Sequence, residues 1–80
     1  MKKIPVDEFL RQIASASHEI GSGLDAIDRG FGNQYYEDAV TKTTALIAEL
    51  PPELCERFPR PDAYTWSQIG NTARSLQASD

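Results

Sequence analysis

The feature that most constrains this chain is a stripe of apolar residues through its first third. Its members recur every three or four positions: Val6, Phe9, Ile13, Ala16, Ile20, Leu24, Ile27 and Phe31. This spacing places side chains on one side of an α-helix and excludes the alternation of a strand. A helix over residues 5–29 would be roughly 37 Å long at about 1.5 Å per residue, longer than the diameter of so small a domain. We therefore expect its far end to meet a bent part of the fold, a second copy or another protein.

Two glycines interrupt this stripe at Gly21-Ser22-Gly23, and the pattern allows two interpretations. A continuous helix would carry each glycine at a cost of about 1 kcal/mol relative to alanine, and the glycines would then mark a kink or a close approach of another backbone. Alternatively, one helix ends at Gly21 and the next begins at Ser22, which forms an S-x-x-D capping box with Asp25. We favour the continuous helix, because the stripe keeps its phase across the glycines.

A second helix is predicted over residues 34–50. Gly30 suits the position just after the first helix, and Asn33 is a favourable N-cap for the second. One side of this helix is apolar: Tyr36, Val40, Thr43, Ile47 and Leu50, widened by Ala39 and Leu46. Pro51-Pro52 ends the helix, since a residue before proline is steered away from helical geometry. A short helical turn is expected to follow at residues 53–58.

A last helix is predicted from Thr65. Thr65 and Gln68 have the spacing of a T-x-x-Q capping box, and Tyr64 and Ile69 have that of a hydrophobic staple. The segment Tyr-Thr-Trp-Ser-Gln-Ile-Gly, residues 64–70, resembles the first helix of bacterial helix-turn-helix units. The resemblance implies a DNA-binding regulator. However, ten residues follow Gly70, too few for a turn and a recognition helix that enters the major groove.

Composition argues against several classes of protein. The net charge is −4 and the basic residues are scattered, so direct nucleic-acid binding through a basic surface is not expected. No run approaches the roughly 18–20 apolar residues of a membrane span, and charged residues interrupt any signal-peptide core after Met1-Lys2-Lys3. The single cysteine, Cys55, forms no internal disulfide and suits a reducing compartment. We therefore expect a cytoplasmic protein.

No group of residues predicts catalysis, a metal site or a cofactor. His18-Glu19 are adjacent, but adjacent side chains diverge by about 100° on a helix, and there is no second histidine. Asp25 and Asp28 lie one turn apart, where Arg29 is spaced to pair with Asp25. Cys55 has no histidine near it in sequence. The prediction is a protein that is not an enzyme and holds neither metal nor cofactor.

Aromatic residues give the clearest indication of function, because they gather at two helix junctions: Phe31, Tyr35 and Tyr36 at the first, Tyr64 and Trp66 at the second. Tyr35 and Tyr36 cannot both point inward from one helix, so at least one ring is expected to be exposed. Exposed Tyr and Trp residues dominate binding hot spots. The same rings could instead close the ends of a small core.

Together, these patterns predict that residues 1–80 form one all-α domain. Its architecture would be a three-helix bundle with a long N-terminal helix as spine and a short helical turn after Pro51-Pro52. The favoured function is a protein-binding module, an inhibitor, adaptor or assembly factor comparable in size and charge to bacterial immunity proteins or phage anti-defence proteins. The alternative is a small dimeric regulator with a degenerate helix-turn-helix. Because so short a chain buries only a marginal core, a homodimer is also expected.

Overall fold

A computed structural model describes residues 6–78 of the chain. These residues form four helices and no strand: α1 (Val6–Asp28), α2 (Gln34–Ala48), α3 (Pro52–Cys55) and α4 (Trp66–Ala78). The all-α class, the long first helix and the helical turn after the double proline are therefore confirmed. The expected start of the first helix at Pro5 lies outside the described residues.

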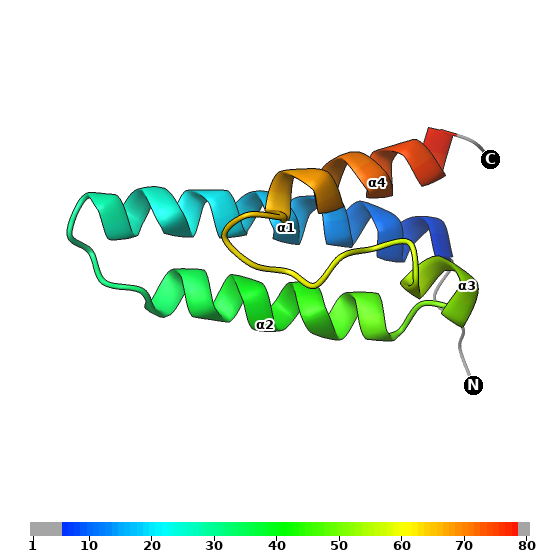
Figure 1. Ribbon diagram of the computed structural model, residues 1–80, viewed down its shortest axis with the longest axis horizontal. Helices are drawn as coiled ribbons and strands as arrows, with labels where there is room; N and C mark the ends of the chain where they lie inside the picture. The colour runs from blue at the N-terminus through cyan, green and yellow to red at the C-terminus, as the bar shows by residue number, and fades with distance from the viewer. Residues whose placement is uncertain (1–5, 79–80) are drawn as a thin grey trace.

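The long helix α1 is the middle member of a flat arrangement (Figure 1). Helix α2 packs along one side of α1 and α4 along the other, both antiparallel to it, whereas α2 and α4 make little contact with each other. The molecule measures 41 × 27 × 17 Å, so its shortest dimension is less than two helix diameters of about 10–12 Å. The prediction that α1 is the spine of the domain is confirmed.

Helix α1 runs unbroken through Gly21-Ser22-Gly23, which decides between the two interpretations. A Cβ atom at Gly23 would lie 2.6 Å from the Cα atom of Tyr36 in α2. A Cβ atom at Gly21 would lie 2.7 Å from the indole ring of Trp66 in α4. The two glycines therefore mark close approaches on opposite sides of α1, and the interpretation with a new helix capped by Ser22 is wrong.

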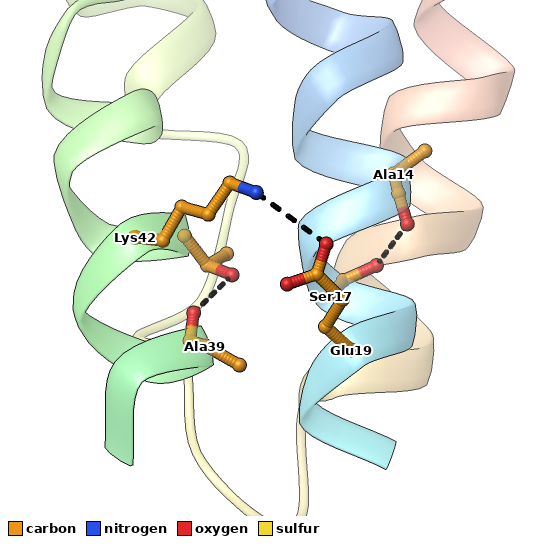
Figure 2. A network of polar contacts seen from close by, with 6 residues as sticks. Ala14, Ser17, Glu19, Ala39 and Lys42 are labelled. Atoms are coloured by element: carbon orange, nitrogen blue, oxygen red, sulfur yellow. Dashed lines mark hydrogen bonds and ion pairs between the residues drawn. The ribbon is translucent and has the colours of Figure 1, made fainter. Parts of the chain in front are cut away.

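The core lies between α1 and the three later helices with their connectors. Its apolar members are less than one-tenth exposed: Leu10, Ile13, Ala16, Ile20, Ala39, Ile47, Leu50, Phe58, Ile69 and Ala73. Two hydroxyl groups are buried beside them. Ser17 donates to the carbonyl of Ala14 at 2.8 Å, and Thr43 donates to the carbonyl of Ala39 at 2.7 Å (Figure 2). Each hydroxyl is thus satisfied within its own helix, which removes the cost of burying it unpaired.

The ends of two helices differ from the expected ones. Helix α2 ends at Ala48 and not at Leu50, because the next two amides donate to carbonyls three residues back. This tightened turn leads directly into Pro51, which disfavours helical geometry in the residue before it. The expected turn at residues 53–58 is a helix from Pro52 to Cys55, and further turns carry Phe58 into the core.

The entry into α4 is built differently from the predicted capping box and staple. Tyr64 is 93% exposed while Ile69 is fully buried, so no staple joins them. The Thr65 hydroxyl does not cap the helix and donates instead to the carbonyl of Arg60 at 2.6 Å. The carboxylate of Asp62 accepts the amides of Tyr64 at 2.8 Å and Thr65 at 3.1 Å. Asp62 is therefore the residue that orders this turn.

Replacing Gly23 by alanine is expected to lower the free energy of unfolding by about 1–2 kcal/mol. The gain in helix propensity is about 1 kcal/mol, but overpacking against the Tyr36 backbone, which cannot turn aside as a side chain can, costs about 2–3 kcal/mol, the upper part of the usual range. Urea unfolding followed by circular dichroism measures the difference. The neighbouring substitution Ser22→Ala is the matched control and should be neutral or slightly stabilising. A Gly23→Ala protein as stable as the original would show that α1 and α2 are further apart than described.

Asp62 makes the stability of the fold sensitive to acid. Its pKa lies below 3.8, chiefly because the Tyr64 amide donates to the carboxylate, with further donation from Thr65. A carboxyl group with a lowered pKa in the folded state stabilises the fold when ionised, and this contribution is lost as the pH falls through that pKa. We expect Asp62→Asn to have a lower melting temperature than the original chain at neutral pH. Well below pH 3.8, the difference between the two melting temperatures should be smaller.

The control for this measurement is Glu56→Gln, which removes an exposed carboxylate from the end of α3. Its melting temperature should follow that of the original chain at both pH values. If Asp62→Asn lowers the melting temperature by the same amount in acid as at neutral pH, the role assigned to the ionised carboxylate is wrong.

Candidate functional site

The junction between α1 and α2 begins with a Schellman turn. The Gly30 amide donates to the carbonyl of Ile27 at 3.0 Å, and the Phe31 amide donates to the carbonyl of Ala26 at 2.9 Å. Gly30 has φ +87°, in the left-handed region, which confirms it as the residue that follows the helix. Gly32 has φ +84°. The backbone of Phe31 is therefore held by a hydrogen bond between two left-handed glycines.

Large apolar side chains are exposed around this turn. Phe31 is 78% exposed, although the residue at this place in a Schellman turn commonly packs back onto its helix. Ile27 is 39% exposed and Tyr35 is 47% exposed, while Tyr36 is half-buried. The exposure of Tyr35 confirms that at least one of the paired tyrosines points outward. We call these four residues the hairpin tip: Ile27, Phe31, Tyr35 and Tyr36.

The hairpin tip is exposed because the covering elements stop short of it. Helix α4 begins beside the middle of α1, where Trp66 lies against Gly21 (Figure 1). The last seven residues of α1 extend about 10 Å beyond this point. Ile20 and Ile27 belong to the same stripe, yet Ile20 is completely buried and Ile27 is not. The apolar stripe is therefore longer than the part of the chain that covers it.

The other two predicted site residues lie elsewhere. Tyr64 belongs to the turn that Asp62 orders, and Trp66 begins α4, so both lie at the start of α4 and not at the hairpin tip. The Trp66 ring is half-buried and fills the space above Gly21. The structure thus divides the predicted aromatic residues between two places, and it gives Trp66 a packing role that Tyr64 lacks.

Negative charge is concentrated around the hairpin tip. Residues 25–38 carry four exposed carboxylates and one exposed guanidinium group: Asp25, Asp28, Glu37, Asp38 and Arg29. Their sum is −3, out of −4 for the whole chain. Arg29 pairs with Asp25 at 3.1 Å, as the spacing predicts, and Gln34 donates to Asp38 at 2.9 Å. Asp28 and Glu37 have no cationic partner among the described residues.

The remaining polar residues considered from the sequence, His18 and Glu19, do not form a metal site with other described residues. His18 is exposed. The Glu19 carboxylate forms an ion pair with Lys42 of α2, with 3.4 Å between Oε2 and Nζ (Figure 2). Within residues 6–78, His, Cys, Asp and Glu side chains form no group of three that could hold a metal ion. No helix of the described chain is long and apolar enough to cross a membrane.

Cys55 lies at the end of the molecule away from the hairpin tip. Its thiol is unpaired and half-buried, and it packs against the core cluster. It borders a shallow hollow of about 350 Å³ that Phe58, Pro59 and Pro61 also line. These contacts agree with a structural interpretation of Cys55.

The sequence places Ile27 in the apolar stripe but does not mark it as a residue of the site. The stripe itself carries no signal that distinguishes Ile27 from the buried Ile20, because both have the same side chain and the same phase. The length of the first helix was the usable signal, since it predicts that one end must remain uncovered. In the described residues α4 is followed by no further helix, so the helix-turn-helix resemblance extends over one helix.

Comparison with protein-family models, curated proteins and solved structures finds no match to this chain. The geometry and charge of the hairpin tip are therefore the guide to function.

Proposed function

We propose that this protein is a non-enzymatic protein-binding module that uses the hairpin tip as its contact surface. It would act as an inhibitor, adaptor or assembly factor of a larger protein. The observation that carries the proposal is Phe31, which is 78% exposed on a turn fixed by backbone hydrogen bonds. Burying a phenylalanine side chain is worth about 1.5–3 kcal/mol. Folding does not bury Phe31, so this free energy is available to the binding of a partner.

The grouping of exposed apolar residues supports this proposal. Five large apolar side chains are exposed among the described residues, and three of them, Ile27, Phe31 and Tyr35, belong to the hairpin tip. Single exposed apolar residues are ordinary on protein surfaces, whereas contiguous ones mark interaction sites. The hydrophobic core cluster includes Leu10 and Ile13, toward the opposite end of α1, and none of the tip side chains belongs to it.

The shape of the tip favours binding over catalysis. It is the narrow end of an elongated molecule, formed by the last turns of α1 and the first turn of α2 (Figure 1). Catalytic sites are usually concave, because a pocket must surround the substrate and exclude water. A projecting apolar end edged with carboxylates suits insertion into a partner's groove.

Phe31→Ala and Tyr35→Ala are expected to weaken capture of the partner about tenfold to a hundredfold, which corresponds to the burial energy of one aromatic side chain. Phe31 is 78% exposed, so Phe31→Ala should change the free energy of unfolding by less than about 0.5 kcal/mol, whereas Tyr35 is 47% exposed and its truncation should cost about 1 kcal/mol. The measurement is a tagged pull-down from native host lysate treated with nuclease, read by mass spectrometry, together with circular dichroism of each variant.

Val6→Ala is the matched control, because Val6 is 37% exposed at the other end of α1. Its capture should equal that of the original chain. Tyr64→Ala tests the start of α4, since Tyr64 is 93% exposed and has no packing role to confuse the result. Loss of the partner with Tyr64→Ala alone, and full capture with Phe31→Ala, would move the contact surface away from the hairpin tip.

A further inference from the structure

We infer that the partner segment bound by the hairpin tip is basic: a protein surface that presents an apolar side chain between lysine or arginine residues. This inference rests on the proposed function and specifies the chemistry of the partner. It also sets this partner apart from a second copy of the chain, which would bring an identical surface to the contact.

Exposed carboxylates without a cationic partner among the described residues lie on both sides of Phe31 along the chain. Asp28 ends α1 and Glu37 lies in the first turn of α2, so Phe31 and Tyr35 lie between two exposed acids in the sequence. Neither acid has an ion-pair partner among residues 6–78, whereas Asp25 pairs with Arg29. A lysine or arginine beside the apolar anchor would find a free carboxylate on either helix.

Asp28 is unfavourable for its own helix. The last turn of a helix carries partial negative charge, which favours lysine or arginine there and disfavours aspartate. Helix α1 has no basic residue in its last turn. An acid in this place works against the stability of α1, and a cation supplied by a partner would relieve the repulsion. Asp28 is therefore better explained by binding than by folding.

The aromatic side chains of the tip add a second kind of attraction. Phe31 and Tyr35 are exposed, and the face of an aromatic ring attracts a guanidinium or ammonium group placed over it. The same cation can then contact a ring and a neighbouring carboxylate together. Aromatic rings with carboxylates beside them can thus bind the apolar side chains of a partner segment through the rings and its basic side chains through the carboxylates and ring faces.

Two observations argue against a second copy at the tip. Residues 25–38 carry a net charge of −3, so a symmetric contact would oppose −3 to −3. The tip is also the projecting end of a molecule only 17 Å thick, and two such ends meet over a small area. A stable interface buries about 800 Å² on each partner, which a groove around the tip supplies more readily than a second tip. The homodimer expected from chain length stays a prediction that would need another surface.

The test uses the full chain and two synthetic amphipathic helical peptides, one of leucine and lysine and the other with every lysine replaced by glutamate. Amide chemical shifts recorded during titration report where each peptide binds. We expect the lysine peptide to shift the amides of residues 24–38, and the glutamate peptide to shift none. Phe31→Ala, which keeps every charge, should weaken binding of the lysine peptide roughly tenfold.

Charge reversal separates a shaped site from general attraction. Asp28→Lys with Glu37→Lys should weaken binding of the lysine peptide by roughly tenfold or more, whereas Glu53→Lys with Glu56→Lys, the same change of net charge at the other end, should leave it within about twofold. Asp28→Lys alone should raise the melting temperature, because it places a cation at the end of α1. The melting temperature of the double variant is measured as well, because Glu37→Lys removes an acid from the first turn of α2 and offsets this gain. A folded double variant shows that the loss of binding does not come from unfolding.

Three results would overturn the inference. Equal weakening by the two double variants would mean that the peptide responds only to net charge. Shifts outside residues 24–38 would place the basic segment elsewhere. A dimer in sedimentation that Phe31→Ala abolishes would make the second copy the occupant. In each case the pull-down with Phe31→Ala still decides by itself whether the tip binds a partner protein.

Discussion

The fold depends on the close approach of α1 to a neighbour on each side. Gly23 lets the backbone of α2 lie against it, and Gly21 leaves room for the Trp66 ring at the start of α4. A third glycine, Gly70 in α4, comes so near to Ser17 that a Cβ atom would lie 2.9 Å from its hydroxyl oxygen. Close packing of this kind strengthens dispersion contacts along α1. It also means that α2 and α4 are held through α1 and scarcely through each other.

A flat arrangement around one helix has a consequence for its ends. In a bundle of equal helices each apolar stripe is covered along its full length, but here α1 has 23 residues and α4 has 13. The difference corresponds to about 15 Å of helix. The uncovered part of α1 carries Ile27 and leads into Phe31, so the proposed contact surface follows from unequal helix lengths. No pocket or reactive group is required to form it.

The sequence predicts the helices better than it predicts their contacts. The stripe predicts α1 and its continuity, and Gly30 predicts where it ends, because helical period and left-handed geometry are local properties. The capping box at Thr65 and the staple at Tyr64 have correct spacing but are not formed. Asp62, outside the motif, accepts the Thr65 amide that Gln68 would take in the box, and the Thr65 hydroxyl donates to Arg60. The candidate site is predicted in part for the same reason. The sequence identifies the aromatic residues, but their division between the hairpin tip and the start of α4 depends on where α4 begins.

The turn that carries Phe31 determines how a partner would meet it. Fixing the backbone of one flexible residue costs about 1–2 kcal/mol in conformational entropy, and an anchor on a loose loop would meet that cost at the moment of association. Here the Phe31 amide is already hydrogen-bonded and the glycines on both sides already hold their left-handed geometry. The anchor is preorganised by the same turn that ends α1. Association would then resemble the docking of two rigid bodies, with the free and bound forms of the tip nearly alike.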